Sequence, residues 1–122
     1  MPRTRIPDED GDRAVLAALD GGDPSTVATA VRYLLQRLAE RSPGNSVEVR
    51  VPPYGAVQCI QGPRHTRGTP PNVVELSAAA WLDLATGARD WATARTGTDV
   101  RASGSRADLT GHLPVWRAPV AR

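Results

Sequence analysis

The stretch VEVRVPPYGAVQCI, residues 47–60, decides the fold class of this 122-residue chain. Valine occupies every second position of 47–51 with charged residues between, which is typical of a strand with one buried face. The turn-forming run Pro-Pro-Tyr-Gly follows at 52–55, and residues 56–60 are apolar enough for a second, more buried strand. The stretch therefore predicts a β-hairpin.

A long amphipathic helix is predicted immediately before the hairpin. Residues 24–41 carry an apolar stripe at helical spacing. Asp23 suits the N-cap of this helix, and Pro24 suits its first position because proline lacks the N–H that would go unpaired there. The helix must pack its stripe on another element.

The C-terminal half predicts two more strands and three short helices. The strands are expected at 73–76 and 100–103. Between them, Ser77 and Asp90 are placed to cap two short helices. A last helix is expected over 105–113, where a serine and an aspartate three residues later resemble a capping box.

This order of elements indicates an α+β fold with a small, mostly antiparallel sheet and helices packed on one face. Residues 1–12 are polar and contain proline, so they predict a loose arm, and 14–19 could form a short helix. We therefore divide the chain into an arm, 1–22, and one folded domain, 23–118.

Composition excludes several classes of function. The net charge is only +2, and the arginines are scattered rather than clustered, so nucleic-acid binding is not expected. Cys59 is the only cysteine, which allows no intrachain disulfide and favours a cytoplasmic protein. No apolar run is long enough to span a membrane, which leaves at most peripheral membrane contact.

The sequence shows no signature of a cofactor, a metal or catalysis. His65 and His112 are too few and too isolated for a zinc site, and Cys59 in an apolar strand is expected to be an inert thiol. The chain has no G-x-S-x-G, no phosphate-binding glycine loop and no dinucleotide fingerprint. We therefore expect a binding protein without a cofactor rather than an enzyme.

Spaced residues in the C-terminal half resemble a known family. The pattern is a tryptophan-bearing helix ending in glycine, a second such helix, a strand leading to glycine, and a leucine-bearing segment: Trp81, Leu84, Gly87, Trp91, Ala94, Gly97, Val100, Gly104, Leu109 and Leu113. This pattern resembles sterol-carrier-protein-2-like domains. Together with residues 45–60 and 62–75, it is similar to the actinobacterial branch of that superfamily, usually described as sterol carrier family proteins. The resemblance covers about residues 24–114.

The resemblance implies a sheet covered by helices, with an apolar tunnel between them for sterols, fatty acids or acyl chains. The expected lining residues are apolar positions of the sheet and the overlying helices: Val49, Val57, Cys59, Val74, Leu76, Trp81, Leu84, Trp91, Leu109 and Leu113. The alternative is that these side chains simply fill the core, and only a cavity distinguishes the two.

One polar loop, Arg64, His65, Thr66 and Arg67, could hold an anionic headgroup. Its two guanidiniums could converge on a carboxylate or a phosphate. The alternative is a long loop held to the body by arginine hydrogen bonds to backbone carbonyls.

The leading hypothesis is non-catalytic binding or transfer of a lipid or another apolar small molecule. Two alternatives remain open. One is a ligand-free interaction or dimerisation module, and the other is an enzyme that uses Arg64, His65 and Arg67.

Overall fold

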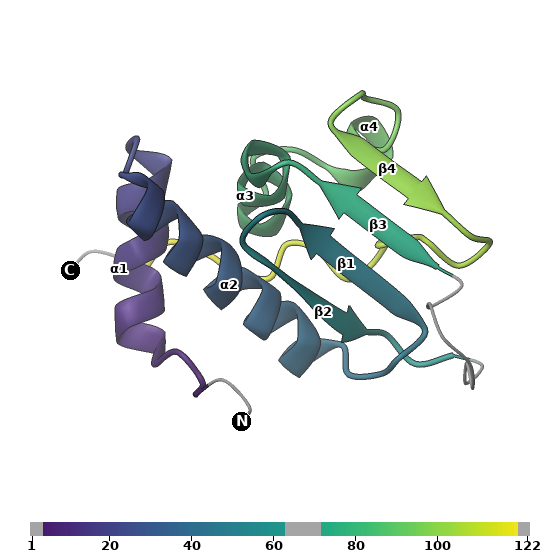
Figure 1. Ribbon diagram of the computed structural model, residues 1–122, viewed down its shortest axis with the longest axis horizontal. Coiled ribbons are helices and arrows are strands. Elements are labelled where there is room, and N and C mark those ends of the chain that lie inside the picture. Colours follow the sequence, from purple (N-terminus) through teal and green to yellow (C-terminus); the bar gives the residue numbers. More distant parts are fainter. Residues whose placement is uncertain (1–3, 63–71, 120–122) are drawn as a thin grey trace.

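The computed structural model describes residues 4–62 and 72–119 (Figure 1). Its elements, in chain order, are α1 (Asp8–Leu19), α2 (Pro24–Arg41), β1 (Val47–Val51), β2 (Gly55–Cys59), β3 (Val73–Leu76), α3 (Ala78–Thr86), α4 (Trp91–Ala94) and β4 (Val100–Ser103). The fold is α+β, as predicted.

The four strands form one mixed sheet in the order β2-β1-β3-β4. β1 and β2 form the predicted antiparallel hairpin, in which Val49 lies opposite Val57. β3 pairs with β1 in parallel and with β4 in antiparallel, so two of the three strand pairs are antiparallel. The prediction of a mostly antiparallel sheet is therefore confirmed.

The two faces of the sheet differ in polarity. Val47, Val49 and Val51 of β1 are fully buried on the face that meets the helices. The alternate residues, Glu48 and Arg50, lie on the other face and form an ion pair of 2.7 Å. Since successive strand residues point to opposite faces, this alternation leaves one face for the core and one for solvent.

Helix α2 lies between the sheet and the N-terminal helix α1 (Figure 1). Its predicted N-cap is confirmed, because the Asp23 carboxylate accepts a hydrogen bond of 2.8 Å from the Thr26 N–H. Leu34, Leu35 and Leu38 of α2 are at most 1% exposed. The apolar stripe read from the sequence therefore faces the core.

The caps predicted for α3 and α4 are also confirmed. The Ser77 hydroxyl accepts from the Ala80 N–H, and the Asp90 carboxylate accepts from the Thr93 N–H. Helix α3 ends at Gly87, whose φ of 88° is in the left-handed region that favours glycine.

The prediction of a loose arm over residues 1–12 is wrong for residues 8–12, which form the first part of α1. Helix α1 packs on α2, and Gly11 lies directly against the Tyr33 ring, so closely that a Cβ at position 11 would collide with it. This contact depends on a partner more than twenty residues away. The polar composition of the segment therefore concealed the helix.

The predicted helix over 105–113 is also wrong, because this stretch forms turns and irregular structure. The Asp108 carboxylate accepts hydrogen bonds from the Thr110 N–H and hydroxyl, at 2.9 and 2.6 Å. Such a local bond between an aspartate and the residue two positions on competes with helix formation. Asp108, which was expected to belong to a capping box, therefore stabilises a turn instead.

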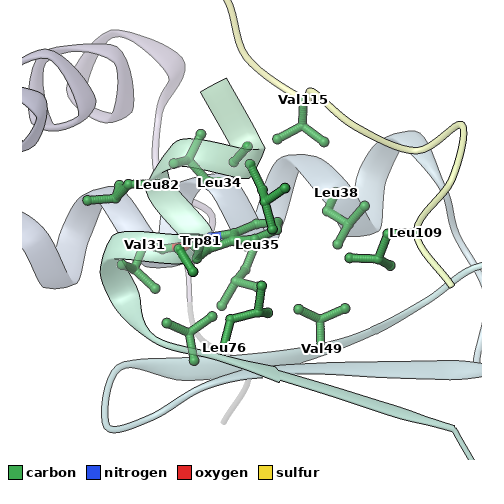
Figure 2. Close-up of a cluster of buried hydrophobic side chains, with 14 of the residues drawn as sticks. Val31, Leu34, Leu35, Leu38, Val49, Leu76, Trp81, Leu82, Leu109 and Val115 are labelled. Atoms are coloured by element: carbon green, nitrogen blue, oxygen red, sulfur yellow. Dashed lines mark hydrogen bonds between the residues drawn. The ribbon is translucent and has the colours of Figure 1, made fainter. Parts of the chain in front are cut away.

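The core lies between the sheet and the helices α2 and α3 (Figure 2). Trp81 of α3 lies at its centre, fully buried, and its indole N–H donates to the Val31 carbonyl of α2. Leu109 and Val115 from the C-terminal segment are fully buried in the same cluster. The segment after β4 thus completes the core without forming a helix.

Candidate ligand-binding site

The structure separates the predicted tunnel residues into three groups. The first group lies in the central core cluster, is at most 2% exposed and lines neither of the two hollows described below: Val49, Cys59, Val74, Leu76 and Trp81. These side chains contribute to the packing that joins the sheet to the helices.

The second group lines one hollow of about 290 Å³ beside α3 and α4. Its lining residues are Leu84, Gly87, Arg89, Asp90, Trp91, Ala92, Leu109, Thr110, Gly111, Leu113 and Pro114, and we call it the Trp91 hollow. Four of the predicted residues, Leu84, Trp91, Leu109 and Leu113, converge there. They come from two helices and from the C-terminal segment, so only the folded chain brings them together.

Two short helices set the shape of the Trp91 hollow. Leu84 belongs to the last turn of α3, and Gly87, which ends α3, faces Pro114 with no side chain between them. Trp91 is the first residue of α4, and its indole N–H donates to the Asp108 carboxylate at 2.9 Å. The indole ring is therefore fixed in orientation.

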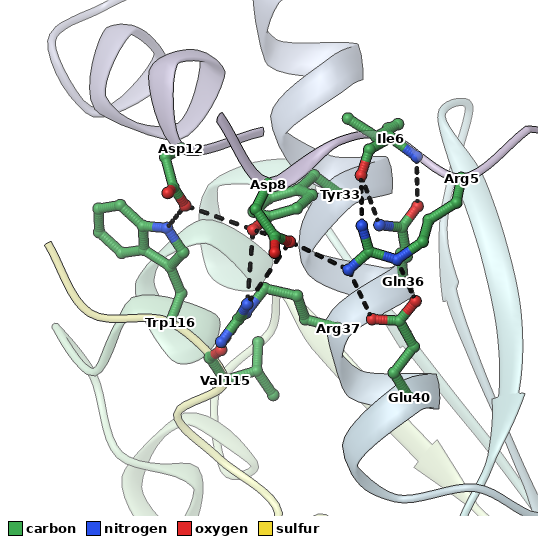
Figure 3. A network of polar contacts seen from close by, with 10 residues as sticks. All are labelled: Arg5, Ile6, Asp8, Asp12, Tyr33, Gln36, Arg37, Glu40, Val115 and Trp116. Atoms are coloured by element: carbon green, nitrogen blue, oxygen red, sulfur yellow. Dashed lines mark hydrogen bonds and ion pairs between the residues drawn. The ribbon is translucent and has the colours of Figure 1, made fainter. Parts of the chain in front are cut away.

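The far wall of the hollow, the segment 109–116, is held by the backbone of α3 and by arginines of α2. The N–H groups of Val115 and Trp116 both donate to the Ala85 carbonyl, at 2.9 and 3.1 Å. Arg37 Nε donates to the Val115 carbonyl at 2.6 Å (Figure 3), and Arg41 donates to the Pro114 carbonyl at 3.0 Å. These bonds fix the wall although it has no regular structure.

Charged groups at the rim of the hollow are already paired with one another. Arg89 donates to Asp83 at 3.1 Å and to Asp99 at 3.2 Å. Asp90 is occupied as the cap of α4, and the hydrogen bond from the Thr93 N–H lowers the pKa of its carboxyl. The hollow thus combines apolar walls with a satisfied polar rim, an arrangement common in small-molecule sites.

The third group has one member, Val57, which lines a different hollow. This groove of about 440 Å³ runs between α2 and the edge strand β2, and the chain before α1 closes it. Its lining residues are Thr4, Ile6, Arg32, Leu35, Gln36, Tyr54, Gly55, Ala56 and Val57, and we call it the α2–β2 groove. Ile6 is held there by Gln36, which bonds both its N–H and its carbonyl.

Cys59 has the environment of a structural thiol. It is fully buried in β2, and burial raises its pKa to about 11. A thiol with so high a pKa is almost entirely protonated near neutral pH and is a poor nucleophile.

The proposed headgroup loop, Arg64, His65, Thr66 and Arg67, lies outside the described residues. Within residues 4–62 and 72–119, no three His, Cys, Asp or Glu side chains come together as metal ligands could. In the same part of the chain, no helix has the length and apolarity to span a membrane.

The sequence did not point to the small residues and prolines that shape the Trp91 hollow. Gly111 lies in the segment 105–113, for which a helix was expected, and Pro114 directly follows it, so their role as a wall was missed. Gly111 has a left-handed φ of 82° in a turn. A glycine at this position is the one feature of the sequence that indicated a turn instead of a helix.

A comparison with curated proteins found no match for the chain. A scan against protein families found one described as bacterial SCP ortholog, in which SCP denotes sterol carrier protein, and it matches residues 23–115. The match begins at the cap of α2 and ends in the wall of the Trp91 hollow, so it includes the whole sheet and every residue that lines that hollow. The chain therefore belongs to the bacterial SCP ortholog family of sterol-carrier-like proteins.

Proposed function

We propose that this protein binds a lipid or another apolar small molecule without chemical conversion, and that the apolar part of the ligand occupies the Trp91 hollow. The observation that carries this proposal is the convergence of Leu84, Trp91, Leu109 and Leu113 on one hollow. The hollow lies wholly within the region that matches a family of carriers. The α2–β2 groove, although larger, depends on Thr4 and Ile6 from outside that region.

The size of the hollow limits the ligand to a short apolar group or one end of a longer chain. At about 290 Å³ it lies at the lower end of the range for small-molecule sites, about 300–1,000 Å³. Each methylene buried contributes about 0.8 kcal/mol, so each one added should tighten binding about fourfold until the hollow is full. Affinity should then stop rising with chain length.

The three tryptophans provide a direct test, because each occupies a different place. Trp91 lines the hollow, Trp81 lies in the core, and Trp116 packs on the other side of the C-terminal segment. A fatty acid brominated on its chain quenches an indole that it touches. We expect saturable quenching by a short brominated fatty acid below its micelle concentration, and we expect Trp91→Phe to remove most of it.

Trp116→Phe is the matched control. Trp116 and Trp91 are 5% and 6% exposed, and each indole donates to an aspartate at 2.9 Å. Trp116→Phe should therefore cost similar packing while leaving the quenching in place. Quenching that persists in Trp91→Phe would place the ligand elsewhere and reject the hollow as the site.

A large side chain introduced into one hollow at a time tests which of the two hollows binds the ligand. Ala92 lines the Trp91 hollow and Ala56 the α2–β2 groove, and both alanines are exposed. We expect Ala92→Phe to weaken fatty-acid binding at least tenfold and Ala56→Phe to leave it unchanged. The reverse result would assign the ligand to the α2–β2 groove.

A further inference from the structure

A third hollow, of about 420 Å³, has three arginines and a histidine among its lining residues. It lies between the C-terminal half of α2 and the segment that follows Thr110. Its lining residues are Arg37, Arg41, Gly111, His112, Leu113, Pro114, Trp116 and Arg117, and we call it the arginine hollow. None of these residues is acidic, so the hollow carries three permanent positive charges and no lining carboxylate.

Two of the guanidiniums are held in place by the backbone of the hollow's own wall. Arg37 Nε donates to the Val115 carbonyl at 2.6 Å and Arg41 Nη1 to the Pro114 carbonyl at 3.0 Å. Each guanidinium has five N–H donors, so these bonds orient the group while using only part of its capacity. Arg37 is further fixed by the Tyr33 hydroxyl, which accepts from it at 3.4 Å (Figure 3).

The histidine of the hollow is oriented in the same way. His112 Nδ1 shares a hydrogen bond of 2.7 Å with the Ser42 hydroxyl, at the end of α2. Its Nε2 makes no hydrogen bond to the part of the chain that the structure describes. The ring can therefore offer this second nitrogen to a ligand.

The positive charge of the hollow is only weakly compensated. Arg37 approaches Asp8 at 4.0 Å, the longest ion pair in the part of the chain that the structure describes. Neither Arg41 nor Arg117 has a carboxylate within 4.0 Å among residues 4–62 and 72–119. This differs from Arg89, whose guanidinium is held between Asp83 and Asp99.

We propose that the arginine hollow binds a phosphate group through Arg37, Arg41, Arg117 and His112. Planar guanidiniums match the oxygens of a phosphate in paired hydrogen bonds, and the fixed orientation of Arg37 and Arg41 reduces the ordering that binding requires. A dianionic phosphomonoester fits three cations better than a single carboxylate does.

The position of this site suggests one source of the phosphate. The arginine hollow and the Trp91 hollow share Gly111, Leu113 and Pro114 as lining residues, so they adjoin along this segment. A phosphate headgroup could bind in one while the apolar part of the same molecule enters the other. This extension to an amphiphile rests on the proposed function, whereas the phosphate site does not.

The test is an NMR titration of the full chain at constant ionic strength with two probes, inorganic phosphate and dihexanoyl phosphatidic acid. We expect saturable shifts of the amides of 111–113 and 115–117 with both probes. Arg41→Gln and Arg117→Gln should each weaken phosphate binding about tenfold, as expected for the loss of a charged hydrogen bond. Arg101→Gln, an equal loss of charge on the open face of the sheet, should have no effect.

The two probes and Ala92→Phe separate the sources of the phosphate and the two proposals. A lipid headgroup predicts that dihexanoyl phosphatidic acid binds more tightly than inorganic phosphate and that Ala92→Phe removes this advantage. Equal affinities, both unaffected by Ala92→Phe, support a site for free phosphate and contradict the extension to an amphiphile, whereas the proposed function is tested separately by the quenching of Trp91. If neither probe shifts 111–117, or if Arg41→Gln and Arg117→Gln bind as the parent does, the phosphate site is wrong.

Discussion

Gly11 shows how a single residue without a side chain allows two helices to meet. Its Cα lies so close to the Tyr33 ring that an added methyl group would collide with the ring face. Tyr33 is fully buried, and its hydroxyl donates to Asp8 at 2.9 Å and contacts Asp12 at 3.3 Å (Figure 3). The ring therefore has little freedom to move away.

We expect Gly11→Ala to destabilise the protein despite alanine's higher helix propensity. Overpacking of this kind costs about 1–3 kcal/mol, which exceeds the gain of about 1 kcal/mol from replacing a helical glycine. Urea unfolding followed by circular dichroism measures the difference. Arg13→Ala, on the exposed face of α1, is the control and should be nearly neutral; an unchanged or higher midpoint for Gly11→Ala would show that α1 does not pack as described.

Cys59 should respond to alkaline pH. Burial raises the pKa of its thiol from 9.0 to about 11 and also keeps the reagent away, so at pH 8 the folded protein should react with iodoacetamide at least about 100-fold more slowly than in urea. Since the unfolded thiol ionises first, the stability that it contributes is complete below pH 9 and is lost as the pH rises toward 11. Cys59→Ala should lose less stability between pH 8 and pH 10.5 than the parent, and equal losses would contradict this assignment.

Among the elements, the short helix α4 depends on its N-cap for stability. Helix α4 spans only Trp91–Ala94, and Asp90 supplies a hydrogen bond of 2.8 Å to the Thr93 N–H. A helix of one turn has little stability of its own, so the cap and the packing of Trp91 must hold it. The position of the Trp91 ring therefore depends on Asp90.

We expect Asp90→Ala to cost about 1 kcal/mol in stability and to weaken binding in the Trp91 hollow. The hydrogen bond lowers the pKa of the Asp90 carboxyl, so its contribution is present above the ordinary value of 3.8 and is lost as the pH falls below it. Urea unfolding at pH 7 and pH 3 should therefore show a larger difference between parent and variant at pH 7 than at pH 3. Asp20→Ala, at an exposed aspartate that follows α1, should not lower the stability at pH 7; equal stability of parent and Asp90→Ala at pH 7 would contradict the role of the cap.

The elements predicted correctly are those whose signals are local. The caps Asp23, Ser77 and Asp90 act within three residues, and the hairpin over 47–60 is set by alternation and a turn. Of the two errors, residues 8–12 depend on a distant partner, Tyr33, whereas 105–113 combines a local bond from Thr110 to Asp108 with a distant one from Trp91.

Those partners explain why the sequence misleads at both ends. The first error lies where Gly11 meets Tyr33, and the second where the Asp108 carboxylate accepts from Trp91 and Thr110 instead of capping a helix. Trp116 of the C-terminal segment in turn donates to Asp12 of α1. Helix α1 and the C-terminal segment thus stabilise each other through contacts between residues far apart in the sequence.

At the level of the whole molecule, hydrophobic periodicity identified apolar residues that become buried. It could not distinguish residues that fill the core from residues that line a hollow. Val49 and Trp81 pack in the centre, whereas Leu113 and Trp91 border a hollow, and all four are apolar residues in equally suitable patterns. A residue that lines a hollow differs from a core residue only in having empty space, instead of another side chain, on one side. Leu113 borders both the Trp91 hollow and the arginine hollow because of where its segment crosses α2 and α3, which only the folded arrangement determines.

An apolar ligand should enter the Trp91 hollow and leave the core between sheet and helices intact. Fluorine NMR of the protein labelled with 5-fluorotryptophan tests it without any substitution, because Trp81, Trp91 and Trp116 each give one signal. On titration with decanol, we expect a saturable shift of the Trp91 signal that is larger than any shift of Trp81 or Trp116. A dominant shift of Trp81, or no shift of any signal up to the solubility limit of decanol, would contradict it.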